Sequence, residues 1–349
     1  MQTKACLPKK AAIAAWCPPC RCLAAAFVTF CAVAGLLVLP LPTAWGGESA
    51  AGWPVRLLTY NEPVPIPTLG GSQLWADELL YHDWRIQRNC LTGHYRLLDG
   101  ANRRHASGSF ASCHLALGEI RRRQDTPPMT GEVVILVHGL FNTRSSMRLL
   151  GAYLERHGAM TVLYFEYPST RGGIEDHAAS LARVVEHLDE AEGIHFVGHS
   201  MGNLVVRYYL ARADGNAEGP GLDPRIGRFL MIAPPNHGAD AADLFADWRL
   251  ARRVAGKSLD QLGPHWPWLE AALGTPPRSF AIIAGGLDNR TGFNPLIAGD
   301  DDGLVSIDDA YLPGAEDFVV VPATHSMLLV DRRVMAHAVH FLRYGRFAE

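Results

Sequence analysis

From Glu132 to the C-terminus, short apolar runs alternate with longer segments in which apolar residues recur every three or four positions. The short runs are rich in valine, isoleucine and leucine, which is typical of strands buried on both faces. The longer segments have the periodicity of amphipathic helices. Since strands that alternate with helices usually pair in parallel, this order predicts an α/β domain with a mostly parallel sheet and helices on both faces.

The same patterns give the order of elements in this domain, residues 132–349. Strands are expected at residues 133–137, 162–167, 194–198, 229–233, 280–285 and 318–321. Helices are expected at residues 145–157, 174–192, 201–213 and 327–344. A tryptophan-rich helical insertion at residues 239–277, with Trp248, Trp266 and Trp268, interrupts the alternation.

The sequence Gly198-His199-Ser200-Met201-Gly202 lies between an expected strand and an expected helix. In this position a Gly-x-Ser-x-Gly pattern is typical of a nucleophile elbow, a tight turn that exposes the serine hydroxyl at the edge of the sheet. The two glycines let the strand and helix backbones approach closely. The helix N-terminus favours negative charge that develops beside it. Ser200 is therefore the candidate nucleophile.

A serine hydroxyl needs a general base, and in folds with such an elbow the partners follow in the order serine, acid, histidine. His325 comes after the last expected strand and before the last expected helix, where it can reach the carboxyl edge of the sheet. His199 belongs to the elbow, and His337 and His340 belong to the terminal helix. We therefore take His325 as the base and the other three as packed or surface residues.

The acid of the triad has several candidates. Asp300, Asp301 and Asp302 are consecutive, and Asp288 also follows the preceding strand. Asp302 opens the segment 302–305, Asp-Gly-Leu-Val, in which a turn followed by apolar residues would fix its carboxylate. Asp302 is favoured and Asp288 is the alternative.

Acyl transfer also needs backbone N–H donors for the oxyanion, one from the residue after the nucleophile and one from a loop after an early strand. Met201 is expected to supply the first donor. Leu140 is expected to supply the second, because Gly139 lets the loop turn inward after the strand. His138 then has a structural role.

Taken together, the segments 138–140, 198–202 and 302–305 with His325 resemble the bacterial triacylglycerol lipase group of the α/β-hydrolase superfamily. The resemblance covers residues 132–344, and residues 233–238 are also similar to a segment of such lipases and of lipid-acting deacylases. It implies the α/β-hydrolase fold and a serine esterase that cleaves a carboxylic ester, such as a lipid acyl ester, through an acyl-enzyme. The insertion at 239–277 occupies the usual lid position, where its tryptophans either cover an acyl pocket or contact a lipid surface, or simply pack on the domain.

The sequence departs from those lipases at one position. They carry a calcium-binding aspartate two residues after the catalytic histidine, and Met327 stands there in this chain. No cofactor is therefore expected, and a calcium requirement does not follow from the resemblance.

The N-terminal segment has the composition of an export signal. Lys4, Lys9, Lys10 and Arg21 precede an apolar run at residues 23–39, which prolines and small residues follow. Residues 1–47 are expected to be a cleaved signal peptide or an uncleaved membrane anchor. In either case the rest of the chain is expected outside the cytoplasm, periplasmic, secreted or held at the membrane.

Residues 48–131 are expected to form a linker and a small N-terminal embellishment, with strands near residues 84–90 and 95–98. Five of the seven cysteines precede residue 48, which leaves Cys90 and Cys113. In an oxidising compartment such a pair is a candidate disulfide.

The net charge of −3 and the absence of a long basic stripe exclude a nucleic-acid partner. No phosphate-loop lysine motif and no dinucleotide glycine fingerprint follow a strand, so phosphoryl transfer and nicotinamide chemistry find no support. An acyltransferase would use the same residues as an esterase. A noncatalytic, membrane-associated binding protein on the hydrolase scaffold is the remaining alternative from a different class.

Overall fold

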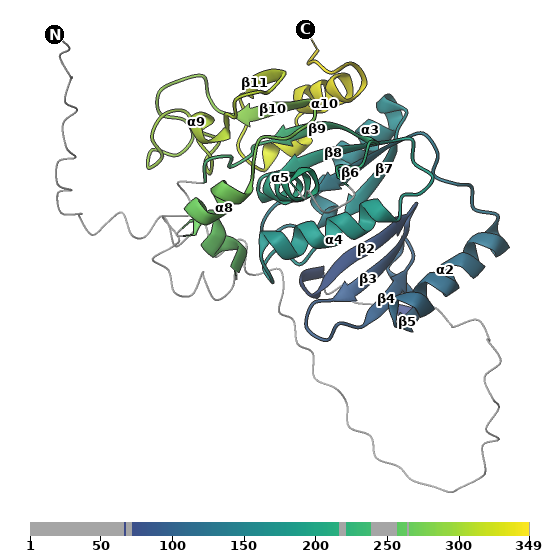
Figure 1. The fold of residues 1–349 in the computed structure, drawn as a ribbon. Coiled ribbons are helices and arrows are strands. Elements are labelled where there is room, and N and C mark those ends of the chain that lie inside the picture. Colours follow the sequence, from purple (N-terminus) through teal and green to yellow (C-terminus); the bar gives the residue numbers. More distant parts are fainter. Residues whose placement is uncertain (1–65, 68–71, 216–220, 239–256, 264, 349) are drawn as a thin grey trace, which may run out of the picture. The chain divides into compact units, whose positions relative to one another are not determined.

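The computed structural model describes residues 66–67, 72–215, 221–238, 257–263 and 265–348, all within one compact unit, Glu62–Glu349 (Figure 1). The predicted targeting segment 1–47 lies outside the described residues. No helix in the described part of the chain is both long enough and apolar enough to cross a bilayer.

The larger sheet has the strand order β11-β10-β9-β8-β6-β7, and every neighbouring pair is parallel. Its strands are β6 (Glu132–Val137), β7 (Thr161–Phe165), β8 (Gly193–His199), β9 (Ile226–Ile232), β10 (Phe280–Gly285) and β11 (Asp317–Val321). The expected parallel sheet is confirmed, with strand ends within a few residues of those predicted.

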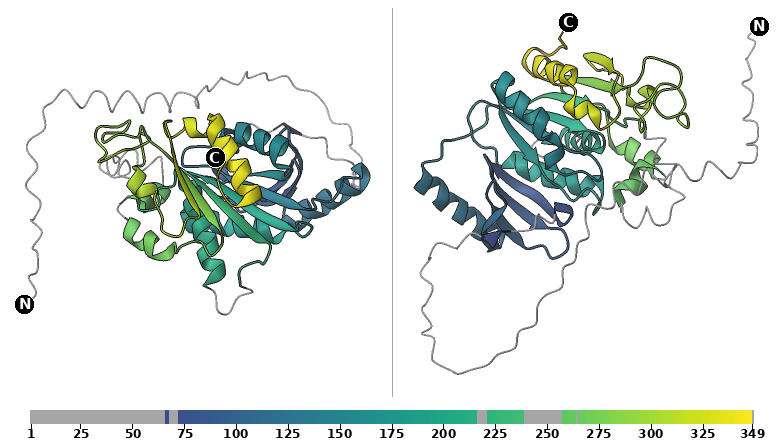
Figure 2. Two further views of the ribbon diagram at one scale, coloured as in Figure 1. Left: turned by 90° about the horizontal axis from the view of Figure 1, so that it is seen from above. Right: turned by 180° about the vertical axis from the view of Figure 1, so that it is seen from behind.

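Helices cover both faces of this sheet (Figures 1 and 2). They are α3 (Arg148–Gly158) and α10 (Arg332–Tyr344) on one face, and α4 (Ile174–Glu186) and α5 (Met201–Asp214) on the other. Strand β6 shows why both faces need cover. Val134 and Leu136 pack in the apolar cluster that contains α3 and α10, whereas Val133, Ile135 and Val137 pack in the cluster that contains α4 and α5. A strand that is apolar on both faces can be buried only between two layers of helices.

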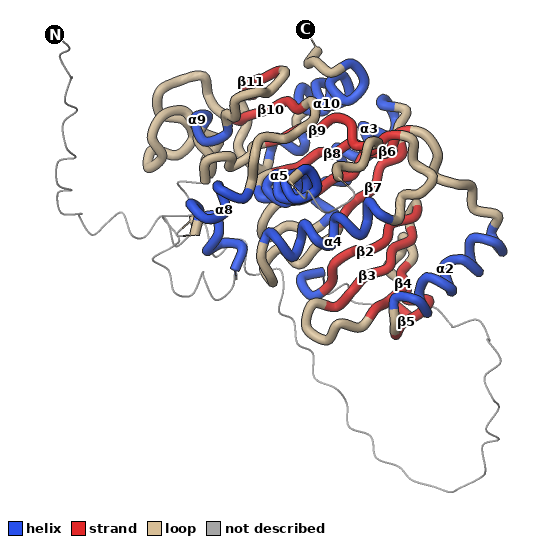
Figure 3. The backbone as a smooth tube through the Cα atoms, viewed as in Figure 1, coloured by secondary structure: helices blue, strands red, loops and turns tan. Residues whose placement is uncertain are grey.

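A second sheet is antiparallel and precedes the parallel one in the sequence (Figure 3). Its order is β1 (Ile66–Pro67), β5 (Arg103–Gly108), β4 (Tyr95–Leu98), β3 (Trp84–Asn89) and β2 (Trp75–Tyr81). Helix α2 (Phe110–Gln124) packs on β3, β4 and β5, and β2 packs against α4. The sequence predicts β3 and β4 but not β2, β5 or α2.

Strand β2 joins the antiparallel sheet to the end of β7 through hydrogen bonds. The backbone N–H of Asp77 donates to the carbonyl of Glu166 at 2.9 Å, and the N–H of Glu166 donates to the Asp77 carboxylate at 2.7 Å. Gln87 on β3 donates to the same carboxylate at 2.8 Å. These bonds let a fully buried strand carry an aspartate, because a buried polar group costs little when it has partners.

The helix ends differ from the prediction at two places for local reasons. Helix α4 ends at Glu186 rather than residue 192, because His187 leaves the helical conformation with φ of −98° and ψ of 10°. The terminal segment first forms a short 3₁₀ turn, η4 (Met327–Val330). Helix α10 then begins after Asp331, whose carboxylate accepts the N–H of Arg333 at 2.8 Å and so caps the new helix.

The predicted insertion is only partly described. Residues 239–256, including Trp248, lie outside the described part of the chain. Residues 257–262 are helical, and α8 (Trp266–Ala272) follows. Trp266 packs against the core, whereas Trp268 is half exposed.

The predicted disulfide between Cys90 and Cys113 is wrong for this structure, because both thiols are free. Cys113 lies on the buried face of α2 among core residues, and burial raises the pKa of its thiol to about 11. Cys90 is exposed just beyond the end of β3, where its N–H donates to the carbonyl of Leu74 at 2.9 Å. One thiol faces the core and the other faces solvent, so the pair does not meet.

Candidate active site

Ser200 occupies the turn between β8 and α5, with φ of 54° and ψ of −130°. A positive φ is rare for a residue with a side chain and marks a strained backbone. A Cβ on Gly202 would clash with the carbonyl oxygens of Val137 and His138, and a Cβ on Gly198 would clash with Asn203. Both glycines are therefore needed for the close approach of strand and helix, as the sequence pattern predicts.

His325 and Asp302 are joined by a short hydrogen bond. The Nδ1 of His325 donates to the Oδ2 of Asp302 at 2.7 Å. The two residues also bond through the backbone, since the N–H of His325 donates to the carbonyl of Asp302 at 2.9 Å. Asp302 is 1% exposed and His325 is 7% exposed. A buried carboxylate at this distance fixes the imidazole tautomer with a free Nε2, which is the form that a general base needs.

The turn after Asp302 holds its carboxylate in place. The N–H groups of Leu304 and Val305 donate to Oδ1 at 3.0 and 2.9 Å, which leaves Oδ2 for the histidine. Asp301 is also buried, but its carboxylate accepts N–H groups of its own loop. Asp288 is exposed. Of the candidate acids, the structure therefore brings Asp302 to His325.

Two buried residues outside the predicted set support this arrangement. The side-chain amide of Asn203 donates to the carbonyl of Ser200 at 2.9 Å and to the carbonyl of Ile232 at 3.0 Å, which ties the elbow to β9. The Nε2 of His199 donates to the carbonyl of His325 at 3.1 Å. Burial, with the nearby His325, lowers the pKa of His199 to about 3, so this histidine is neutral. The signal for Asn203 in the sequence is a polar residue in an otherwise apolar stretch of helix.

The two segments expected to form the oxyanion hole both reach the serine. Met201 is the first residue of α5, and its N–H belongs to the unpaired first turn of that helix. The loop after β6 reaches the same place, because a Cβ on Gly139 would lie 2.9 Å from the Cβ of Ser200. Leu140 follows Gly139 in that loop. No hydrogen bond from the N–H of either Leu140 or Met201 to another described residue is recorded.

His138 shapes this loop from inside the protein. Its Nδ1 donates to the carbonyl of Gly139 at 2.9 Å, and its ring stacks on Tyr167 with 4.3 Å between the centroids. The hydroxyl of Tyr167 donates to the carbonyl of His138. Burial lowers the pKa of His138 to about 4, so its neutral ring has the packing role that the sequence indicates.

The site residues all follow parallel strands at their carboxyl ends. Leu140 follows β6, Ser200 follows β8, Asp302 lies in the loop after β10, and His325 follows β11. This edge is where ligands bind in open α/β sheets. Ser200 is half-buried, and its hydroxyl makes no hydrogen bond to another described residue.

Among the residues that the structure describes, no group of three or more His, Cys, Asp or Glu is placed to hold a metal ion.

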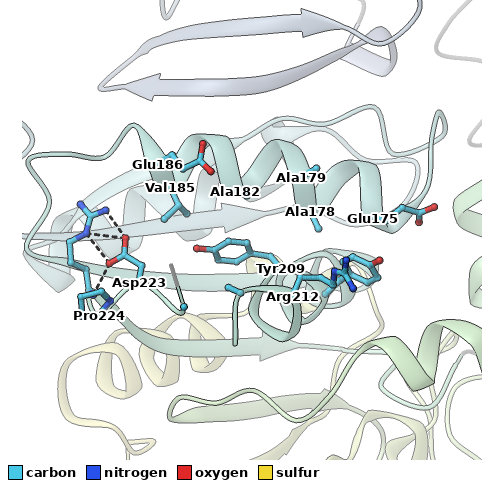
Figure 4. A pocket seen from close by; sticks show the side chains of 14 residues that line it. Glu175, Ala178, Ala179, Ala182, Val185, Glu186, Tyr209, Arg212, Asp223 and Pro224 are labelled. Atoms are coloured by element: carbon cyan, nitrogen blue, oxygen red, sulfur yellow. Dashed lines mark hydrogen bonds and ion pairs between the residues drawn. The ribbon is translucent and has the colours of Figure 1, made fainter. Parts of the chain in front are cut away.

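One cavity of the described residues lies away from the candidate site. It measures about 850 Å³ and opens between α4 and α5 (Figure 4). Small side chains such as Ala178 and Ala182 and the ring of Tyr209 line it, and the ion pair of Asp223 with Arg225 closes one end. This cavity contains none of the predicted site residues, so it is separate from the candidate active site.

Several solved structures are similar to this chain. The lipase BlEst2 of Bacillus licheniformis is 18% identical, with a TM-score of 0.47, over 63% of this chain and 92% of its own. A gene product of Listeria innocua is 18% identical, with a TM-score of 0.44, over 63% of this chain and 96% of its own. A metagenomic carboxyl esterase is 22% identical, with a TM-score of 0.43, over 56% of this chain and 64% of its own.

No curated protein matches the chain. The model of the alpha/beta hydrolase family does match, over residues 134–338, which include the elbow, Asp302 and His325. That span is more than half of the chain and coincides with the parallel sheet. The chain therefore belongs to the alpha/beta hydrolase family.

Proposed function

We propose that this chain hydrolyses carboxylic esters through an acyl-enzyme, with Ser200 as nucleophile, His325 as general base and Asp302 as the orienting acid. The observation that carries the proposal is the 2.7 Å hydrogen bond between buried Asp302 and His325, at the edge of the sheet where a strained turn holds the half-buried Ser200. The same arrangement of roles is needed in every serine hydrolase with such a triad.

In the proposed reaction, His325 Nε2 takes the proton of Ser200 while Oγ attacks the ester carbonyl. The N–H groups of Leu140 and Met201 stabilise the oxyanion of the tetrahedral intermediate. His325 then returns the proton to the departing alcohol, which leaves an acyl group on Ser200. A water molecule, activated by the same histidine, releases the acid.

An apolar acyl group is the proposed substrate class. The loop that carries Asp302 exposes several large apolar side chains, and Met327 is exposed two residues after His325. These loop residues are Leu287, Phe293, Leu296 and Leu304. Exposed apolar side chains gathered near a site are typical of surfaces that receive apolar ligands or lipid. These exposed apolar side chains support a lipid ester as the substrate. They agree with the resemblance to lipases in the sequence.

Replacing the acid at two positions tests the triad. Asp302→Asn should reduce kcat on p-nitrophenyl esters by about 10⁴-fold, the loss that follows when a triad aspartate no longer sets the histidine tautomer. Asp288→Asn is the matched control and should keep full activity. Ser200→Ala should abolish both ester hydrolysis and labelling by a fluorophosphonate. The proposal fails if Ser200→Ala retains full activity, and a loss of activity in Asp288→Asn but not in Asp302→Asn would reassign the acid.

We further propose that residues 1–47 direct the chain out of the cytoplasm, as a cleaved signal or as an anchor. The basic residues before the apolar run at 23–39 support this proposal.

A further inference from the structure

A cavity of about 180 Å³ lies between the antiparallel sheet and the segment that follows the loop after β6. Four arginines line it: Arg85 on β3, Arg96 on β4, Arg144 in the 3₁₀ turn η3 (Arg144–Met147) and Arg148 at the start of α3. Among the described residues that line it, Glu166 is the one that carries a carboxyl group. Guanidinium groups thus converge on one small space from two separate parts of the fold.

Arg85 is the most informative of these residues, because it is 4% exposed and yet incompletely paired. Its Nη2 donates to Asn102, but Nε and Nη1 are buried and have no hydrogen-bond partner among the described residues. Leaving donors of a charged group buried and unpaired is costly. Such a group in a native fold needs an explanation, and a bound water molecule or ion that an anionic ligand could replace is one.

The two arginines on the opposite wall are also available. The structure records no hydrogen bond or ion pair from the guanidinium of Arg144 or Arg148 to another described residue. Burial lowers the pKa of Arg85 to about 10, and the positive charges of Arg144 and Arg148 contribute to that fall. At neutral pH the guanidinium remains charged.

The nearby carboxyl groups do not neutralise the cluster. Burial raises the pKa of Asp77, whose negative charge stabilises the charged form of Arg85. Burial, together with Asp77, raises the pKa of Glu166 to about 7. Four guanidinium groups line the cavity and only two carboxyl groups, Asp77 and Glu166, act on Arg85 there, so positive charge remains in excess around the cavity.

The size and shape of the cavity define the class of ligand. It is smaller than the roughly 300–1,000 Å³ of pockets that hold drug-sized molecules, so an acyl chain or a nucleotide does not fit within it. Guanidinium groups bind carboxylate and phosphate in a bidentate manner. A carboxylate offers two oxygens in one plane, whereas a tetrahedral phosphate can present oxygens to both walls of the cavity.

We propose that this arginine cavity binds a phosphate group, carried by inorganic phosphate or by the headgroup of a phospholipid. The site contains none of Ser200, Asp302 and His325, so it does not depend on the proposed ester hydrolysis. It does lie next to the loop after β6, which carries Leu140. Glu166 accepts the N–H of Arg144 at 3.2 Å through one oxygen, and its other oxygen lies 3.6 Å from the Nε2 of His138.

Calorimetric titration of the full chain with inorganic phosphate tests the proposal. The double variant Arg144→Gln/Arg148→Gln removes both guanidinium groups from one wall of the site. Neither position is buried, so the fold should be kept, which circular dichroism can verify. Because the variant loses charge-assisted hydrogen bonds to the anion, the dissociation constant should rise by at least about tenfold. The control Arg156→Gln/Arg332→Gln loses the same charge at exposed positions elsewhere and should bind phosphate as the natural chain does.

Two further titrants distinguish the source of the phosphate. Glycerol 3-phosphate that competes with inorganic phosphate, with no arginine-dependent binding to vesicles, would support a soluble ligand. Arginine-dependent binding to vesicles of phosphatidic acid in phosphatidylcholine would support a lipid headgroup. The proposal is overturned if the natural chain does not bind inorganic phosphate, if both double variants bind it equally, or if acetate binds as tightly as phosphate.

Discussion

Asn203 is the residue whose role in the site depends most on its exact position. Its side chain spans the carbonyls of Ser200 and Ile232, and so it connects the first turn of α5 to the neighbouring strand. The strained backbone of Ser200 persists only because such contacts hold it. We regard Asn203 as a positioning residue, since it touches the backbone of the nucleophile and not its hydroxyl.

Asn203→Ala removes both hydrogen bonds. We expect unfolding free energy to fall by about 1–3 kcal/mol. The rate at which a fluorophosphonate labels Ser200 should fall by about 10-fold to 100-fold, because small displacements of a nucleophile slow its reaction strongly. Chemical unfolding and timed labelling measure the two effects. A variant with lower stability but an unchanged labelling rate would show that Asn203 serves the fold alone.

His177 gives a prediction about acid stability. It is buried on α4, and burial lowers its pKa to about 3. An unfolded chain binds a proton on this histidine below about pH 6.5, whereas the folded chain does not, so stability is lost as the pH falls below that value. Between pH 7.5 and 5.5 the loss from this one group is about 1.4 kcal/mol.

His177→Gln should remove that part of the pH dependence. Urea unfolding at pH 7.5 and pH 5.5 would then show a gap between the two values that is about 1.4 kcal/mol smaller in the variant than in the natural chain. The same exchange at the exposed His157 is the control. An identical pH dependence in the His177 variant and the natural chain would mean that another group takes up the proton.

At the scale of elements, the antiparallel sheet and the parallel sheet share one core. Leu79 and Leu80 on β2 belong to the same apolar cluster as Leu181, Val184 and Val185 on α4. Without β2, these apolar residues of α4 would face water. The antiparallel sheet is therefore part of the folding unit and not a detachable addition.

Shortening the chain tests this conclusion. A chain that begins at Ile66 should keep the thermal midpoint of the whole described unit. A chain that begins at Thr126 loses α2 and the antiparallel sheet, and it should aggregate or unfold at a much lower temperature because α4 exposes apolar surface. Thermal unfolding followed by circular dichroism, with size-exclusion chromatography, compares the two. A monomeric and equally stable short chain would contradict the shared core.

The sequence predicts the parallel sheet well because β6, β8 and β10 are apolar on both faces, and their burial needs no information from elsewhere in the chain. Strand β2 was not predicted for the opposite reason. It carries Asp77 and Glu78, whose partners Glu166 and Arg183 are distant in the sequence. Strand β5 has the sequence Arg-Arg-His-Ala-Ser-Gly, which lacks any apolar alternation.

In the candidate site too, local sequence predicts some residues, whereas others depend on partners that are distant in the sequence. Ser200, Asp302 and His325 could be chosen from motifs and chain order, because the turn chemistry around each is local. The bonds of Asn203 to Ile232 and of His199 to His325 join segments that only the folded chain brings together. The arginine cavity could not be predicted for the same reason, because its walls come from the antiparallel sheet and from the segment that follows the loop after β6.

At the scale of the whole molecule, the prediction concerns the compartment in which the chain acts. If residues 1–47 direct export, Ser200 in intact cells should be labelled by a fluorophosphonate that does not cross the inner membrane. Deleting residues 1–47 should keep the protein in the cytoplasm and protect it from the same probe. Cell fractionation with immunodetection gives an independent readout. Equal labelling of both forms in intact cells would contradict an export role.

The hydrogen bonds between Asp77 and Glu166 cannot form until well after Asp77 has been synthesised, because 89 residues separate the two partners. At a synthesis rate of roughly 5–20 residues per second, β2 emerges about 4 to 18 s before the strand end that completes its bonding. Helix α4, which covers β2, emerges later still. During that interval an apolar strand with an unsatisfied aspartate is exposed, and a chain passing through a membrane pore would reach the far side in this state. We therefore expect the newly made chain to need a chaperone most before α4, which ends at Glu186, has emerged.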